Sequence, residues 1–326
     1  MSRRSAAPPD PQVVSASRSE QVLRRLDLQV TRRLDGLLQG DYLGLLPGPG
    51  SEPGESRVYQ AGDDVRRIDW NVTARTTVPH VRDQVADREL ETWVVVDCSA
   101  SLDFGTALCE KRDLAVAAVG AVGFLTARIG NRMGAVVIEP ERVRRIPARH
   151  GRQALFALLH SLITRPRAEP GAGGTDLAGG IRHLVQPPQR RGLAVVVSDF
   201  LAPGGWEKPL RALALRHQVL AIEIVDPREL ELPDVGYLAM IDPETGRRLE
   251  VPTGKASLRA RYAEAAAAQR AAIAGSIRRS GAQHLQLRTD RDWMRDVVAF
   301  VVSNRRRRGA LVATPPLGAA VAGVGR

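Results

Sequence analysis

Short apolar runs alternate with amphipathic segments from residue 93 onward. Each run is too short for a buried helix and is bounded by polar or turn residues, which predicts buried β-strands. The segments between them carry apolar positions at helical spacing. Strands without a polar face are typical of a parallel sheet covered by helices on both sides. The pattern therefore predicts a doubly wound α/β domain over residues 93–304, with strands at 93–97, 133–138, 193–199, 219–225 and 283–288 and helices at 108–129, 151–163, 206–216 and 290–303.

The segments outside this alternation have different patterns. Residues 1–18 are predicted to be a disordered arm, and residues 19–92 to form an N-terminal helix followed by a small β-rich segment. Turn signals such as Asp226-Pro227 and Asp242-Pro243 predict an inserted hairpin ahead of a long helix, so an insertion is expected at about 226–280. Residues 305–326, first basic and then rich in Ala and Gly, are predicted to be a disordered tail.

Composition and charge narrow the classes of function. The chain of 326 residues has a formal net charge of +11, and its C-terminal third, residues 255–308, holds 13 basic against 4 acidic residues. This surplus leaves nucleic-acid binding open as an alternative. Only 4% of the residues are aromatic, which argues against a base-stacking platform. Two cysteines, Cys98 and Cys109, are too few for a disulfide framework or a cysteine-based zinc site.

The sequence also bears on location. No apolar run approaches the roughly 20 residues that a membrane-spanning helix needs, and the first residues lack the apolar core of a secretory signal. We therefore expect a cytoplasmic protein without a membrane span, although its partner could be membrane-anchored.

The residues that follow the predicted strands carry the most chemistry. Asp97 ends the first strand and is followed by Ser99 and Ser101, Asp199 ends another strand, and Thr175 lies in a glycine-rich loop that opens a helix. The carboxyl ends of parallel strands form the ligand-binding edge of such a sheet. Two carboxylates and three hydroxyls at one edge form an all-oxygen set, which suits Mg²⁺ or Mn²⁺.

These five residues resemble the metal-ion-dependent adhesion site of von Willebrand factor A domains. That site has an Asp-x-Ser-x-Ser segment, matched by Asp97, Ser99 and Ser101, followed by a distant threonine and a distant aspartate, matched by Thr175 and Asp199. The resemblance implies direct ligation by the hydroxyls and ligation largely through water by the aspartates. Mostly neutral ligands leave the cation under-neutralised, so it attracts a carboxylate from a protein partner. The cation need not be bound constitutively.

A second block, residues 56–75, resembles the defining segment of the family catalogued as domain of unknown function fifty-eight. Ala61 stands where proline is more usual, and Phe104-Gly105-Thr106 and Lys111 also look like that family. The block is expected either to pin the β-rich segment to the main sheet through ion pairs, with Trp70 buried as an anchor, or to form a partner-contact face. Its residues are Gly62, Asp63, Asp64, Arg66, Asp69, Trp70 and Arg75.

The family resemblance implies a non-enzymatic, metal-assisted adaptor that works with a MoxR-type AAA+ ATPase, or with its client, in chaperone-like maturation or a stress response. An enzyme remains an alternative, because two aspartates at strand ends also resemble the site of a Mg²⁺-dependent phosphohydrolase. Against it, Ser99 stands where a phosphoaspartate mechanism of the haloacid-dehalogenase type wants a second aspartate. The third possibility is a nucleic-acid-binding module that uses the basic C-terminal third.

Overall fold

The computed structural model describes residues 52–61, 63–85, 91–127, 131–169, 171, 173–185, 192–202 and 204–312. The predicted arm at 1–18, the predicted N-terminal helix that follows it and the end of the predicted tail at 313–326 lie outside the described residues.

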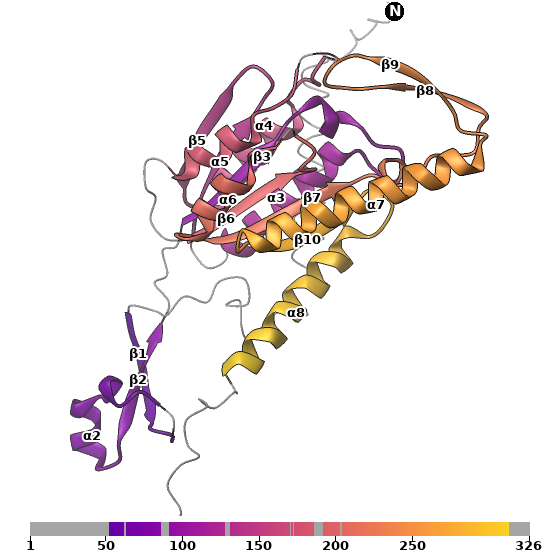
Figure 1. Ribbon diagram of the computed structural model, residues 1–326. Coiled ribbons are helices and arrows are strands. Elements are labelled where there is room, and N and C mark those ends of the chain that lie inside the picture. Colours follow the sequence, from indigo (N-terminus) through magenta and orange to yellow (C-terminus); the bar gives the residue numbers. More distant parts are fainter. Residues whose placement is uncertain are drawn as a thin grey trace, which may run out of the picture.

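A six-stranded sheet forms the centre of the domain (Figure 1). Its order is β10-β7-β6-β3-β4-β5, and every neighbouring pair is parallel except β4 with the edge strand β5. The predicted strands are confirmed, and so is the mostly parallel, doubly wound fold class. The strands are β3 (Glu91–Asp97), β4 (Arg132–Ile138), β5 (Val143–Arg149), β6 (Gly192–Ser198), β7 (Gln218–Val225) and β10 (Gln283–Arg288).

Helices cover both faces of this sheet because alternate side chains of each strand enter different cores. Val94 and Val96 pack into one core, while Trp93 and Val95 pack into the other. The first core lies under α3 (Lys111–Ala127), α4 (Arg152–Ile163) and α8 (Trp293–Val312), and the second under α5 (Leu177–Val185), α6 (Glu207–Ala214) and α7 (Ala256–Arg279). Burial on both sides explains why the central strands β3 and β6 are mostly apolar.

Two predicted boundaries need correction. The insertion predicted at 226–280 contains only the short helix η4 (Pro227–Glu229) and the hairpin of β8 (Tyr237–Ile241) and β9 (Arg248–Pro252). Helix α7 belongs to the main fold, because it connects the parallel strands β7 and β10 and buries Ile273 and Ile277 in the core. The tail predicted from residue 305 is helical up to Val312, where α8 ends.

The predicted β-rich segment before the sheet is also present. It consists of β1 (Glu52–Val58), η2 (Val65–Arg67), α2 (Trp70–Thr76) and β2 (His80–Val85). β1 pairs with β2 in an antiparallel two-stranded sheet, and Asp69 caps α2 by accepting hydrogen bonds from the backbone N–H groups of Asn71 and Val72.

The neighbouring strands β3 and β6 lie at the middle of the sheet, where its two halves meet. From β3 the chain builds the sheet outward through β4 and β5, and it then returns to β6 and builds the other half through β7 and β10. The direction of winding therefore reverses between β3 and β6. A crevice forms at such a switch point, outside the carboxyl ends of the two strands, and it is where doubly wound folds bind ligands.

The start of β6 allows a test of the close packing between these two strands. A Cβ atom at Gly192 would overlap the carbonyl oxygen of Glu91 on β3, whereas nothing lies within 4 Å of a Cβ at Gly204. We expect Gly192→Ala to lower the free energy of unfolding by about 1–3 kcal/mol and Gly204→Ala to change it by less than about 0.5 kcal/mol, as measured by urea denaturation. Equal effects of the two substitutions would contradict the tight β3–β6 register.

Candidate metal-ion centre

Asp97 ends β3 at the switch point, and its carboxylate accepts hydrogen bonds from neutral donors. Oδ1 accepts from the backbone N–H of Ser99 at 2.9 Å and from the hydroxyl of Thr175 at 3.2 Å, and Oδ2 accepts from the hydroxyl of Ser198 at 2.6 Å. The side chain is 2% exposed. Burial raises the pKa of Asp97, and the charge of nearby Asp199 raises it further, while the hydrogen bonds from Ser198 and Ser99 act in the opposite direction.

A chain of hydroxyls links this loop to Asp199, which directly follows β6. Ser99 Oγ and Ser101 Oγ share a hydrogen bond of 2.9 Å, and Ser101 Oγ donates to Asp199 Oδ2 at 2.7 Å. The other oxygen of Asp199 accepts from the backbone N–H of Leu201 at 3.1 Å. The turn after Asp199 places Phe200 at a φ of 57°, a conformation that is fixed by burial of its ring against Trp206.

The structure therefore brings all five residues of the predicted site together. They come from three segments. A continuous path of hydrogen bonds joins them in the order Thr175, Asp97, Ser99, Ser101 and Asp199. Four of the five are buried, and Ser101 is half-buried.

Lys111, at the start of α3, supplies a positive charge to the same cluster. Its side chain is fully buried, and its ammonium donates to Asp199 Oδ2 at 2.9 Å and to Glu229 Oε1. Burial opposes ionisation of both Asp199 and Lys111, but their mutual attraction outweighs it. The pKa of Asp199 is therefore lowered and the pKa of Lys111 is raised. Asp97 and Asp199 thus differ, because neutral groups solvate the first and an ammonium neutralises the second.

A buried arginine extends this network into helix α7. Arg270 donates to the backbone oxygen of Asp199 at 2.9 Å, to Glu223 at 3.0 Å and to Glu229 at 2.8 Å. Sequence analysis missed Arg270, although it lies four residues after Ala266 and three before Ile273, in the apolar seam of the helix. A basic residue in such a seam signals a buried carboxylate partner.

The buried charge network contains more acidic than basic groups. Among the described residues four carboxylates face two basic groups, so with every carboxylate ionised the network holds two more acidic than basic groups; His284 pairs with one of the carboxylates, Glu223. The charged members are Asp97, Asp199, Glu223, Glu229, Lys111 and Arg270.

The donor set at the switch point fits a hard divalent cation. Carboxylate and hydroxyl oxygens are the ligands that Mg²⁺ and Mn²⁺ prefer, and a divalent cation would balance the surplus charge. Within the described ranges, no group of three or more His, Cys, Asp or Glu side chains has the arrangement of a metal site, so hydroxyl ligands would be essential here. Burial raises the pKa of Cys98, which lies between Asp97 and Ser99, to about 12, so its thiol stays protonated.

The family block at residues 56–75 lies in the segment of β1, α2 and β2. Arg57 pairs with Asp63, and Arg66 with Asp64, so these ion pairs join residues of the block itself. The prediction that Trp70 is buried was wrong. At the first position of a seven-residue helix, Trp70 is 71% exposed, because the preceding Asp69 turns inward as the cap and accepts a hydrogen bond from Ser56.

The remaining residues of the block differ in exposure. Arg75 is exposed, Asp69 is 5% exposed, and Gly62 lies outside the described residues. The pinning interpretation combined ion pairs with a buried Trp70, and the burial of Trp70 is absent.

The strand order is that of a doubly wound α/β domain, and aspartate, serine and threonine side chains gather at its switch point. The chain belongs to the DUF58 family: the family model described as "Protein of unknown function DUF58" matches residues 55–272. Similar relatives include "Uncharacterized protein Rv1480" of Mycobacterium tuberculosis and "Uncharacterized protein Mb1516" of Mycobacterium bovis. Each is 58% identical over 302 residues, which cover 93% of this chain and 92% of the relative.

Solved structures with some likeness to the chain include the protein BatB of Bacteroides thetaiotaomicron and the von Willebrand factor A domain of SpRpn10. BatB is 13% identical, with a TM-score of 0.38, over 67% of this chain and 99% of BatB. The SpRpn10 domain is 12% identical, with a TM-score of 0.37, over 72% of this chain and all of that domain. The fold class is defined by the strand order of the central sheet.

The pairing of Lys111 gives a testable prediction. Lys111→Met removes the ammonium that pairs with the buried carboxylate of Asp199 and with the partly buried Glu229, which keeps Arg270. We expect the loss at Asp199 to lower the free energy of unfolding by about 3–5 kcal/mol. Lys208→Met makes the same chemical change at an exposed position of α6 and should cost less than about 0.5 kcal/mol. Chemical denaturation of both variants measures the difference, and a Lys111→Met protein as stable as the Lys208→Met control would refute the assigned charge pairing.

Proposed function

We propose that this chain is a non-enzymatic protein-interaction module whose contact site is a divalent cation, Mg²⁺ or Mn²⁺. Asp97, Ser99, Ser101, Thr175 and Asp199 would hold the cation, which in turn would bind a carboxylate of a protein partner. The observation that carries the proposal is the convergence of these five oxygen-bearing side chains at the switch point of the sheet.

The charge balance supports an adhesive role for the cation. Lys111 already neutralises Asp199, and the hydroxyls of Ser99, Ser101 and Thr175 carry no charge. A cation among these groups would retain part of its positive charge, because few of its ligands would be anionic. A carboxylate from another protein is the group best able to complete its coordination.

The hydrogen bonds of the hydroxyls support a non-enzymatic role. Ser99 and Ser101 bond to each other, Ser101 bonds to Asp199, and Thr175 bonds to Asp97. In the described part of the chain none of them bonds to a histidine, the general base that most often activates a hydroxyl nucleophile. These bonds support a role of the three hydroxyls as ligands.

The partner that the family resemblance suggests is a MoxR-type AAA+ ATPase or its client, and the proposed location is the cytoplasm. No helix of the described part is both long and apolar enough to cross a membrane. An accessible carboxylate on that partner is the chemical requirement that the proposal makes.

Metal binding is tested with a variant that keeps the charge of the site. At about 100 times its dissociation constant, Mg²⁺ should raise the free energy of unfolding of the wild type by about 2.7 kcal/mol. Ser99→Ala should need at least about tenfold more Mg²⁺ for the same effect. Ser303→Ala removes an exposed hydroxyl that bonds only within α8 and should behave as wild type. Thermal unfolding at increasing Mg²⁺ measures all three, and a wild type indifferent to Mg²⁺ and Mn²⁺ would refute the metal site.

Partner binding is tested by retention on the immobilised protein. We expect the partner to be retained by wild type and by Ser303→Ala in Mg²⁺, and to be lost in EDTA and from Thr175→Ala, because only an intact cation site can capture a carboxylate. A purified MoxR-type ATPase is the first candidate to apply. Retention that is equal under all these conditions would show that contact occurs elsewhere on the chain.

A further inference from the structure

The inserted hairpin of β8 and β9 ends in a turn that is held in shape by its own side chains. Asp242 accepts hydrogen bonds from the backbone N–H of Glu244 at 3.0 Å and from the hydroxyl of Thr245 at 2.6 Å. The backbone N–H of Gly246, at a φ of 70°, donates to the carbonyl of Asp242 at 2.8 Å. The turn therefore presents Glu244 in a defined position.

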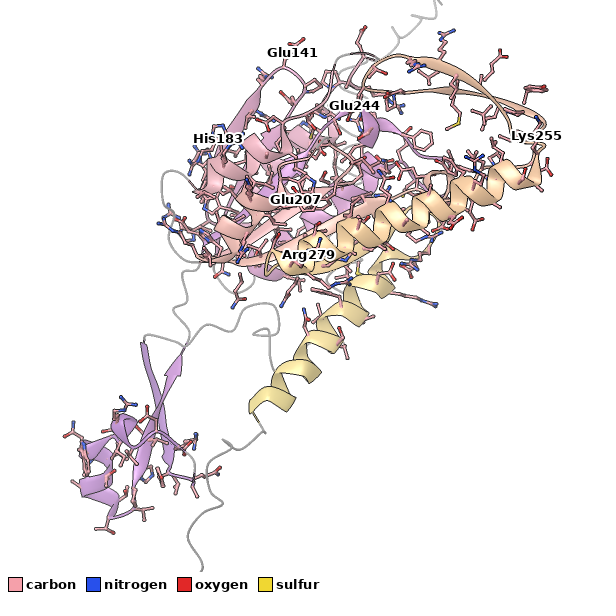
Figure 2. The ribbon with its side chains drawn as sticks, in the orientation of Figure 1. Glu141, His183, Glu207, Glu244, Lys255 and Arg279 are labelled. Carbon is pink, nitrogen blue, oxygen red and sulfur yellow. The ribbon has the colours of Figure 1, made fainter. Side chains whose placement is uncertain are left out.

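This turn lies against the loop that carries Thr175. The backbone N–H of Gly171 donates to Pro243 at 3.0 Å, and that of Gly173 donates to Glu244 at 3.1 Å. A Cβ atom at Gly174 would be 3.0 Å from Glu244 Oε2. Figure 2 shows Glu244 at the end of the hairpin opposite to Lys255, where α7 begins. The side chain of Glu244 thus reaches the residue next to Thr175.

The carboxylate of Glu244 is half-buried, and among the described residues it has no hydrogen bond or ion pair. Burial raises the pKa of Glu244, and the negative charges of Asp199 and Asp97 raise it further. The like charges of these three carboxylates repel one another. Within the described residues they are not grouped as a metal site by themselves, and a cation among them would offset their repulsion.

We propose that Glu244 is a built-in carboxylate ligand of the cation site, which occupies in cis the place that a partner's carboxylate would take. The inference rests on the proposed function, because it assumes the same cation. The hairpin then regulates the site, and a partner binds only by displacing Glu244.

The rest of the hairpin is suited to such a displacement. Among the described strands, β8 and β9 pair only with each other, and an isolated two-stranded hairpin is marginally stable. A mainly apolar cavity of about 720 Å³ is lined by this hairpin and by its surroundings, including Leu232, Leu238, Met240 and Tyr262, and it extends to Ser101 and Glu244. Leu238 and Met240 face inward, while Tyr237 is exposed.

The cavity specifies the chemistry of the competing partner. Because it is continuous with the rim of the cation site, one ligand can reach both. The partner segment would place an aspartate or glutamate on the cation and an adjacent apolar side chain in the space that the hairpin now covers.

The test measures Mn²⁺ binding by the full chain in the absence of any partner. We expect Glu244→Gln to weaken Mn²⁺ binding about tenfold, the lower end of the effect of removing a supporting group from a metal site. Glu250→Gln makes the same change on the exposed face of β9 and should leave the affinity within about twofold of wild type. Isothermal titration calorimetry gives the affinities, and amide hydrogen exchange of residues 237–252 gives the state of the hairpin.

The exchange experiment separates ligation from a general effect of charge. Saturating Mn²⁺ should slow exchange of residues 237–252 in wild type and in Glu250→Gln, and this protection should be lost in Glu244→Gln. If wild type binds Mn²⁺ and Ser99→Ala weakens that binding, but Glu244→Gln matches wild type in affinity and protection, the cis ligand is refuted and the cation site stands. If wild type binds no Mn²⁺, both proposals fail.

Discussion

Asp97 and Asp199 are buried next to each other at the ends of neighbouring parallel strands, and the surrounding groups are arranged to offset their repulsion. Two like charges in a region of low dielectric raise each other's pKa unless they are neutralised or solvated. Here Asp97 is surrounded by hydroxyl and N–H donors, whereas Asp199 is paired with the ammonium of Lys111. This division leaves one carboxylate neutralised by an ammonium and the other solvated by neutral donors alone.

The same charges connect the site to the inserted hairpin. Glu229 lies in η4, just before the hairpin, and pairs with Lys111, while Arg270 lies in α7, after the hairpin, and pairs with Glu229 and Glu223. Both segments that flank the hairpin are therefore fixed to the site by buried ion pairs, and its turn contacts the Thr175 loop through Pro243. A cation that binds at the switch point would therefore affect the hairpin. Its two flanking segments are fixed, and among the described strands β8 and β9 pair only with each other.

The segment of β1, α2 and β2 differs, because the bonds of its acidic residues described above are to groups of the same segment. Its acidic residues are used locally, with Asp69 as a helix cap and Asp63 in an ion pair with Arg57. Trp70 and Val65 are 71% and 60% exposed on the same small unit. The family model begins within β1 and runs into α7, so it spans this unit as well as the sheet and the hairpin.

Much of the fold could be predicted from local sequence. Strands such as 93–97 and 193–199 are recognisable because both of their faces are buried, which leaves only apolar residues between the flanking polar ones. The five residues of the candidate site could be predicted for a related reason. Once the strands are placed, parallel topology brings their carboxyl ends to one edge, so Asp97 and Asp199 lie at the same edge, and the strand order then makes them neighbours. The family signature supplied Thr175, whose loop has no strand to fix its position.

Other features depended on contacts between residues far apart in the chain. The roles of Lys111, Glu229, Arg270 and Glu244 arise from positions that only the folded chain brings within reach of Asp199 or Asp97, and single-residue patterns carry no information about such distances. Trp70 was misassigned because its burial would have required a partner surface, and hydrophobicity alone does not specify one. The sequence by itself determined the elements and the edge of the sheet that carries the chemistry, because periodicity and strand order are local or topological properties. Only the tertiary structure decided how the charges pair, because electrostatic interactions depend on distance and burial in three dimensions.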